Sequence, residues 1–353
     1  MATVTYKCPN CGAPLEFNAE SQNWTCDFCD SEFTAAALEA HTEQASSFDY
    51  AAADDPQTGS DFSGEILEYA CPNCGARILT DKNTSATFCL FCHSPAILSE
   101  RLTGEFRPSA VIPFQMDKQA ATTAFLNWCK RKPLVPKDFK SGDQLQKISG
   151  LYVPFWLFHC RVTGSIHARA QNIRSWTSGD YRYTETSHYA VSRRAHMEFN
   201  GIPADGSQKM DDSLMQTLEP YDYSGLQKFD MGYLSGYFSE KYDLNNQDVF
   251  PNISDRLSQY TESILRGTIH GYGSVTVVDR DLQYNQVHAD YALLPVWMLT
   301  YQRKGKSYMF AMNGQTGKVA GRLPVSFARA AGWFLGIAAG LFALCSLIGG
   351  IIG

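Results

Sequence analysis

Two groups of cysteines repeat along the first hundred residues with nearly the same spelling. One group begins Cys-Pro-Asn-Cys-Gly-Ala at Cys8, and the other begins with the same six residues at Cys71, 63 positions later. Each group consists of a C-x2-C pair, fourteen further residues and a second C-x2-C pair. Four thiolates presented as two tight pairs suit one tetrahedral Zn²⁺ ion. The sequence therefore predicts two structural zinc ions, with the ligands Cys8, Cys11, Cys26, Cys29, Cys71, Cys74, Cys89 and Cys92.

Other chemistries of paired cysteines fit this pattern less well. Disulfides belong to secreted chains, and the short polar stretch Met1–Tyr6 contains no signal peptide. Rubredoxin-like iron would use the same geometry and stays open as an alternative. A redox-active C-x-x-C is disfavoured because two pairs at matched spacing indicate a closed structural site. His93 directly follows Cys92, but the four cysteines already complete the ligand set, so we expect His93 not to bind metal.

The elements that must position these cysteines are short. Fourteen residues are enough for a β-hairpin that carries the second pair under the first, and Gly12 and Gly75 supply positive φ after each leading pair. Neither group can bury a core alone, so bound metal would supply about 10–16 kcal/mol of folding free energy per site. We expect small apolar clusters of Tyr6, Leu15, Phe17, Trp24 and Phe33 around the first site, and of Ile78, Leu79, Phe88 and Phe91 around the second.

Negative charge is concentrated in the cysteine-containing part of the chain. Residues 1–100 contain three Lys or Arg and fifteen Asp or Glu, a net charge of −12, whereas the whole chain has −6 and the remainder therefore +6. Zinc bound by four thiolates adds about −2 per site. A nucleic-acid-binding ribbon needs a basic face that replaces phosphate counterions. The charge therefore favours a protein partner over DNA or RNA.

The other end of the chain is apolar. Residues 330–353 contain no charged side chain, and a helix of that length would span roughly 36 Å, against about 30 Å for a bilayer core. The pattern predicts one transmembrane helix, with Trp333 near its entry. Arg322 and Arg329 precede it, so the positive-inside rule predicts a single-pass protein of the inner (cytoplasmic) membrane with its N-terminal domains in the cytoplasm.

Three glycines follow one another at intervals of four in this segment: Gly332, Gly336 and Gly340. Such a stripe allows two helix backbones to approach closely in lipid, so we expect it to support a homo-oligomer.

The sequence predicts five segments. These are a first zinc ribbon over 1–34, an acidic flexible linker over 35–64, a second ribbon over 65–100, an α+β body with an antiparallel sheet over 101–329, and the transmembrane helix over 330–353. The linker would leave the two ribbons not rigidly fixed to each other.

Inside the body, Asp117 is expected to cap a helix that ends near Lys130, and a second helix is expected over 253–266. Strands are expected over 157–170, 181–200, 273–280, 292–302, 306–312 and 318–322. The similarity of Leu151–Leu157 to Ala292–Met298 suggests two related halves.

We find no catalytic constellation in the sequence. His159 and Cys160 are adjacent in a strand and therefore point to opposite faces. His167, His188 and His196 lie on expected strands, where half-exposed structural histidines are the simpler interpretation. No G-x4-G-K-[ST] loop is present. We therefore expect no enzymatic activity, and a metal-dependent enzyme in the body stays as a weaker hypothesis.

The combination of features resembles a known family. Its elements here are the two Cys-Pro-Asn-Cys-Gly-Ala blocks and the stretches GLYVPFWLF (150–158), LPVWMLT (294–300) and MNGQTGK (312–318). The chain is similar to bacterial membrane-anchored double zinc-ribbon proteins encoded near phage-shock protein A and SPFH (flotillin-like) proteins, which are often labelled primosomal helicase-like. The resemblance implies a role in recruiting or organising membrane-stress or SPFH assemblies.

The sequence thus favours a membrane-anchored adaptor that uses its zinc ribbons to dock protein partners. The expected partners are membrane lipid, through the C-terminal helix, and an SPFH or phage-shock protein A-type protein. The alternative is a nucleic-acid-binding zinc-ribbon protein linked to replication or transcription.

Overall fold

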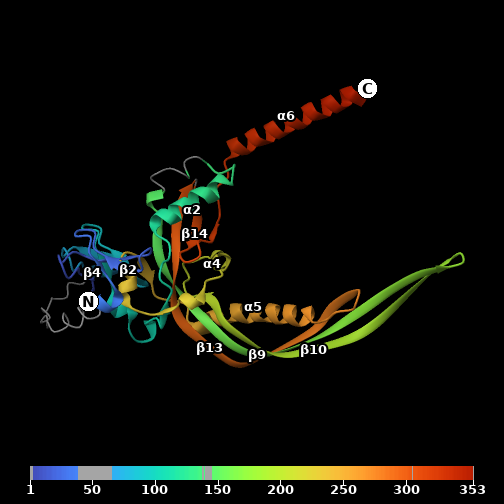
Figure 1. The fold of residues 1–353 in the computed structure, drawn as a ribbon, viewed down its shortest axis with the longest axis horizontal. Helices are drawn as coiled ribbons and strands as arrows, with labels where there is room; N and C mark the ends of the chain where they lie inside the picture. The colour runs from blue at the N-terminus through green and yellow to red at the C-terminus, as the bar shows by residue number, and fades with distance from the viewer. Residues whose placement is uncertain (1–2, 39–65, 137–138, 140–144, 304, 353) are drawn as a thin grey trace. The chain divides into compact units, whose positions relative to one another are not determined.

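The computed structural model describes residues 3–38, 66–136, 139, 145–303 and 305–352 (Figure 1). Almost all of the predicted linker over 35–64 lies outside these residues. The chain divides into two compact units. Unit 1 comprises Met1–Val153, Lys209–Lys241 and Leu293–Gly353, and unit 2 comprises Pro154–Gln208 and Tyr242–Ala292. Two long strands, β9 (Ser149–Ser178) and β13 (Ser274–Arg303), contribute residues to both units.

Unit 1 is rich in short strands. They are β1 (Glu16–Asn18), β2 (Asn23–Thr25), β3 (Glu32–Phe33), β4 (Ile66–Ala70), β5 (Arg77–Asp81), β6 (Thr84–Phe88), β7 (Pro95–Ile97), β8 (Ala110–Val111), β11 (Gln227–Lys228), β12 (Phe238–Glu240), β14 (Lys306–Asn313) and β15 (Val319–Gly321). Strands β1, β2 and β3 form one small sheet, and β4 and β5 form a hairpin. The main sheet has the order β11-β8-β13-β9-β12-β6-β7, with β14 between β13 and β15.

The sheet-rich body predicted from the sequence is confirmed, with one difference in strand direction. The expected antiparallel pairings include β13 with β14 and β14 with β15. Strand β12, however, runs parallel to β9. The sequence did not indicate this pairing, because β12 is three residues long and shows no periodicity that can be recognised.

The helices of unit 1 are α2 (Lys118–Lys130), α4 (Asp212–Leu218) and α6 (Phe327–Ile352). Helix α2 begins where the sequence predicts, because the Asp117 carboxylate accepts a hydrogen bond of 2.7 Å from the Ala120 backbone N–H. Its apolar face packs on β14, where the rings of Phe125 and Phe310 meet edge to face at 4.8 Å. Short 3-10 turns occupy Ser99–Leu102, Gly104–Phe106, Tyr223–Gly225 and Met231–Leu234.

Aromatic side chains fill the core of unit 1. The Phe114 ring stacks on Tyr237 at 4.2 Å and meets Tyr152 edge to face at 5.0 Å. A Cβ atom at Gly150 would lie 2.6 Å from a ring carbon of Tyr237, so only glycine lets β9 approach this cluster. The core is thus built from segments far apart in the sequence.

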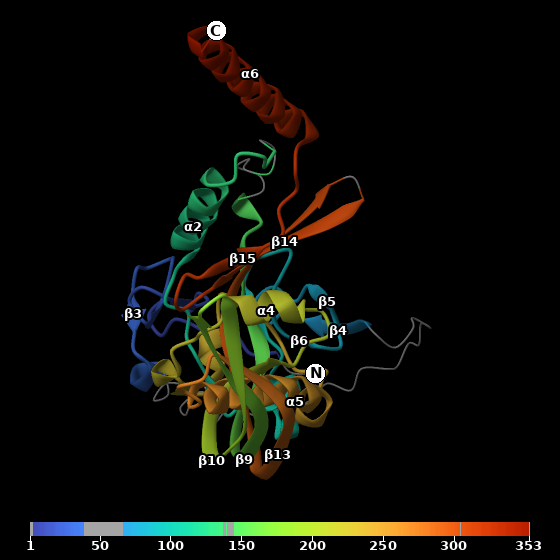
Figure 2. The ribbon, with the colours of Figure 1, turned by 90° about the vertical axis from the view of Figure 1, so that its right-hand side faces the viewer.

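Unit 2 consists of a helix on three long strands. Strand β10 (Tyr181–Asp205) forms an antiparallel hairpin with β9, and β9 in turn neighbours β13 (Figure 2). Helix α5 (Asn246–Gly267) lies along these strands (Figure 1). Gly164 permits the close approach, since a Cβ there would lie 2.3 Å from the Thr261 methyl group. The buried face of α5 repeats every four residues: Val249, Ile253, Leu257, Thr261 and Leu265.

The predicted elements of unit 2 lie in the right places but are too short. Helix α5 begins seven residues before the predicted 253, at a capping box in which Asn245 and Asp248 satisfy each other's backbone N–H. The strands predicted over 273–280 and 292–302 are parts of the single strand β13. The residues between the two predicted strands are mostly polar, so they show little of the apolar alternation by which a strand is recognised. The sequence pattern therefore predicted two short strands and not one long strand.

The two cysteine groups are not independent of each other. The Val4 backbone N–H donates to the Ile97 carbonyl at 2.8 Å, and Ile97 donates back at 3.0 Å. The Thr5 hydroxyl also donates to the Pro95 carbonyl at 2.9 Å. The expectation that the linker leaves the ribbons not rigidly fixed to each other did not include these contacts and stays a prediction. The segment before Cys8 adds to β7, a pairing that charge and linker composition do not reveal.

The C-terminal helix requires a correction. In the part of the chain that the structure describes, no helix is long and apolar enough to cross a membrane. The transmembrane helix predicted over 330–353 is therefore not confirmed. An added Cβ at Gly332, Gly336 or Gly340 would meet no atom within 4 Å.

Candidate metal centres

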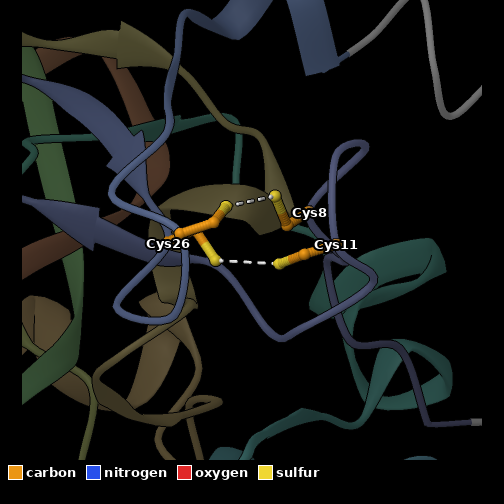
Figure 3. Close-up of side chains that lie close together, drawn as sticks. Cys8, Cys11 and Cys26 are labelled. Atoms are coloured by element: carbon orange, nitrogen blue, oxygen red, sulfur yellow. Dashed lines mark hydrogen bonds between the residues drawn. The ribbon is translucent and has the colours of Figure 1, made fainter.

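The first cysteine group closes into one compact site. Two tight turns present it: the Gly12 N–H donates to the Cys8 carbonyl at 2.8 Å, and the Asp30 N–H donates to the Cys26 carbonyl at 2.9 Å. Gly12 has φ of 75° and Asp30 has φ of 53°, as such turns require. The sulfur atoms of Cys8 and Cys11, from the first turn, and of Cys26, from the second, point toward one another (Figure 3).

The second cysteine group has nearly the same geometry. The Gly75 N–H donates to the Cys71 carbonyl at 2.8 Å, and the His93 N–H donates to the Cys89 carbonyl at 2.9 Å. His93 has φ of 57° and occupies the turn position that Asp30 has in the first group. Its ring is not part of the ligand cluster, as the sequence predicts.

Distances between the sulfur atoms fit a tetrahedral ion. Cys8 and Cys29 lie 3.6 Å apart and Cys11 and Cys26 3.5 Å apart, and both corresponding pairs of the second group are 3.7 Å apart. Four sulfurs at ~2.3 Å from a zinc ion would be separated by about 3.8 Å. Among the described residues, the clusters of ligand atoms within 4.8 Å of one another are these two sets of four. All eight predicted ligands are therefore brought together as expected, and each set can bind one metal ion.

Hydrogen bonds around the last cysteine of each set recur in both groups, and they were not predicted from the sequence. The Asn10 amide donates to the Ser31 hydroxyl oxygen at 2.8 Å, and that oxygen lies 3.2 Å from the Cys29 sulfur. Asn73, Ser94 and Cys92 repeat the arrangement at 2.8 and 3.4 Å. The hydrogen bond from the serine side chain is the largest influence on the last thiol, and the pKa falls to about 6 for Cys29 and about 5 for Cys92. The repeated motifs C-P-N-C and C-x-S, which contain these asparagines and serines, could have predicted the hydrogen bonds.

Replacing the serines that contact Cys29 and Cys92 should weaken metal binding without removing a ligand. We expect Ser31→Ala or Ser94→Ala to lower the affinity of the affected site about 10–100-fold, because the thiolate loses its hydrogen-bond donor. Competition with a chromophoric chelator measures this loss. Thr123→Ala, on the exposed face of α2, serves as the control and should leave both affinities unchanged. Equal affinities in all three variants would contradict a role for these serines.

Trp24 attaches the first cysteine group to the turn Met231–Leu234. Its indole N–H donates to the Gly232 carbonyl at 2.8 Å, and its ring lies 5.2 Å from Phe17 and 5.4 Å from Tyr233. The Phe17 N–H donates to the Ser235 carbonyl at 3.0 Å, which extends the contact along β1. The predicted cluster around this site is therefore shared with the turn Met231–Leu234, and it is not a property of the ribbon alone.

The second group differs from its predicted packing. Ile78 is buried, but Leu79 and Phe91 are exposed, and Phe88 packs on Phe238 at 5.2 Å. The buried cluster around Cys71 and Cys89 contains instead Tyr69, Ile78, Ala96 and Leu98. Strand alternation explains the error, because Leu79 follows Ile78 directly and must face the other side of β5.

A buried arginine also stabilises the second group. Arg101 is 7% exposed and donates from Nε to the Tyr69 hydroxyl at 2.8 Å and from Nη2 to Thr80 Oγ1 at 3.2 Å. Its guanidinium lies 4.9 Å from the centre of the Tyr69 ring. These contacts connect β4, β5 and the turn Ser99–Leu102, so Arg101 attaches the metal-bearing hairpin to the turn after β7.

The three histidines that the sequence placed on strands do not converge. His167 Nδ1 lies 3.0 Å from the Ser192 hydroxyl, and His196 Nδ1 lies 2.9 Å from the Thr163 hydroxyl. His188 lies opposite Gln171 in the β9–β10 register. Each of the three histidines therefore has a different neighbour on the paired strand.

Comparison with known proteins finds a relative that aligns with this chain over nearly its whole length. No protein-family model matches the sequence, and no solved structure matches it. The uncharacterized protein YdjG of Bacillus subtilis (strain 168) is 39% identical over 350 residues, which cover 99% of this chain and 98% of that protein. Similarity of this extent includes both cysteine groups, both units and α6. The chain belongs to the family of this Bacillus subtilis protein.

Proposed function

We propose that the protein is a non-catalytic adaptor whose two zinc-stabilised ribbons dock a protein partner. The observation that carries the proposal is a repeated exposed aromatic side chain. Phe28 and Phe91 occupy the same position in the second turn of each cysteine group, and they are 78% and 74% exposed. Leu90, beside Phe91, is exposed as well. Large apolar side chains held outward by rigid turns are typical of protein-binding surfaces.

Charge supports a partner with a basic surface. The first ribbon, residues 1–34, contains one lysine and five acidic residues, and Asp27 and Asp30 on either side of Phe28 are exposed. A bound ion with four thiolates adds about −2. An apolar pocket surrounded by Lys or Arg side chains would match this surface, whereas a phosphate backbone would be repelled.

Zinc is the metal we propose for both sites. Closed sets of four thiolates with short spacing are typical structural zinc sites, and zinc has no redox chemistry to perturb the fold. Metal analysis separates zinc from the iron alternative, because an iron centre held by four thiolates absorbs visible light and zinc does not. Two zinc ions per chain are expected.

The main functional test identifies the partner protein by photo-crosslinking. A photo-crosslinking amino acid at position 28 or 91 in cells should capture one and the same protein, while the same group at the exposed Tyr181 in unit 2 should not. The captures should disappear when Cys8, Cys11, Cys71 and Cys74 are changed to Ser. An SPFH-domain or phage-shock protein A-type protein is the candidate to test first, by the family resemblance given above.

Purified components then quantify the contact. We expect Phe28→Ala combined with Phe91→Ala to weaken the captured complex at least tenfold, about 1.4 kcal/mol. Tyr181→Ala is the matched control. An unchanged dissociation constant would contradict the docking proposal. Captures at positions 28 and 91 that share no protein would contradict it as well.

Attachment to the inner membrane by α6 and self-association through its glycines stay predictions. The support is the row of exposed apolar side chains in the described part of α6, which includes Trp333, Phe334 and Phe342. Flotation of the full chain with lipid vesicles tests attachment, and a chain that stays with the soluble fraction would contradict it.

A further inference from the structure

A polar cluster on unit 2 joins two histidines to one carboxylate. His159 belongs to β9, while His288 and Asp290 belong to β13, the neighbouring strand. The His288 Nε2 atom lies 2.9 Å from Asp290 Oδ1, and the His159 Nε2 atom lies 3.4 Å from Asp290 Oδ2. His288 and Asp290 are two positions apart, so strand geometry places them on the same face. The carboxylate therefore lies between two imidazoles, with one oxygen directed at each.

The orientation of His159 is fixed by a third strand. Its Nδ1 atom lies 3.2 Å from the Asn200 side-chain oxygen, which comes from β10. An amide oxygen only accepts hydrogen bonds, so this contact forms when Nδ1 carries the proton. In the neutral imidazole Nε2 then has a lone pair, and this lone pair faces a carboxylate oxygen. Either a proton or a metal cation can bridge two acceptors at this distance. A carbonyl-type oxygen behind Nδ1 is also the usual orienting contact of a metal-ligating histidine.

The cluster is open to solvent. The cluster borders a cavity of about 450 Å³, which is lined by His159, Asn200 and His288, together with Cys160, Arg161, Glu198, Gln286 and Val287. The Arg161 guanidinium in this lining is engaged by Glu198 at 3.8 Å and Gln286 at 3.1 Å. The side chains of His159, Asp290 and His288 are 37%, 44% and 72% exposed. A hydrated ion can therefore reach the carboxylate and both imidazoles from outside.

The two rings require a small movement to share an ion. Their centres are 6.4 Å apart, and the three residues are not among the described sets whose ligand atoms all lie within 4.8 Å of one another. The His288 side chain is 72% exposed, so rotation about its χ angles meets little packing. Asp290 already contacts both rings and is the natural first ligand. The site is thus assembled on binding and is not closed beforehand, in contrast to the cysteine sets.

We propose that His159, His288 and Asp290 form a third metal site, which binds a divalent transition ion such as Zn²⁺ or Cu²⁺ reversibly. Two imidazole nitrogens and one carboxylate oxygen are the ligands that these ions share, and Mg²⁺ or Ca²⁺ would prefer oxygen alone. Exposure and the lack of thiolates make this site weaker than the cysteine sites. Binding would connect β9 to β13 and stabilise unit 2. The proposal does not depend on the docking function.

Cobalt titration tests this site on the full-length protein with both cysteine sets already loaded with zinc. Co²⁺ does not displace zinc from thiolates, because its affinity is lower in the divalent series. We expect one equivalent of Co²⁺ to bind, with a visible spectrum that lacks the thiolate-to-cobalt charge-transfer band. His288→Ala and Asp290→Asn should each weaken binding at least tenfold.

His167→Ala is the matched control, an imidazole on the same strand β9 that should leave cobalt affinity within twofold of the parent. Unchanged hydrogen exchange in the unit 2 part of β9 and β13 shows that unit 2 of each variant is folded. Absence of a cobalt equivalent beyond the two zinc sites would overturn the proposal. Binding that persists unchanged in the combined His159→Ala and His288→Ala variant would overturn it as well.

Discussion

Removing the metal ions from the purified protein should unfold both cysteine groups and loosen the part of unit 1 that contacts them. Each site is expected to supply about 10–16 kcal/mol of folding free energy, more than a small domain's net stability of roughly 5–15 kcal/mol. The effect should extend beyond the ribbons, because Trp24 and Phe17 hold the turn Met231–Leu234. Hydrogen exchange before and after chelation measures it, with faster exchange expected at 15–18, 23–25 and 231–237.

Cysteine variants separate the two sites. Cys8→Ser combined with Cys11→Ser should leave one metal ion per chain and protect β4 and β5 while β1 and β2 exchange fast. Cys129→Ala is the control, because Cys129 is buried in α2 and belongs to neither ligand set; it should retain two ions. Unchanged exchange in the chelated protein would show that the ribbons fold without metal and would contradict this account.

Trp24→Ala should have the largest effect among single substitutions outside the ligand sets. Trp24 is 2% exposed, contacts Phe17 and Tyr233, and donates a hydrogen bond of 2.8 Å to the Gly232 carbonyl. Truncating a buried tryptophan costs about 3–5 kcal/mol, which includes the cavity that remains. The loss should appear in the free energy of unfolding of unit 1 in urea, while both metal ions remain bound.

Phe28→Ala is the matched control for this substitution. It also removes an aromatic ring from the first ribbon, but the ring is exposed and has no packing to lose, so a change within about 0.5 kcal/mol is expected. Proteolysis should distinguish the two variants, since only Trp24→Ala frees the ribbon from the turn Met231–Leu234. Equal stability of both variants would mean that the ribbon is not held by this contact.

Local features were predictable from the sequence. The eight metal ligands, the turns after Cys11 and Cys74 and the cap at Asp117 are all set within a few residues of chain. The full lengths of α5 and β13 were not, because polar residues on exposed faces weaken the periodicity by which such elements are recognised. The exposed positions of Leu79 and Phe91 were misjudged for a related reason: apolar character alone does not say which side of a strand a residue faces.

The sequence by itself determined the chemistry of the cysteine sets, because all four ligands of each set lie within 22 residues and short turns suffice to assemble them. Only the tertiary structure decided what those sets are attached to. The contact of Trp24 with Gly232, the addition of Val4 to Ile97, and the meeting of His159 with Asp290 join residues about 90 to 210 positions apart. Such pairs depend on strand order and register across the whole sheet, which no local spacing records.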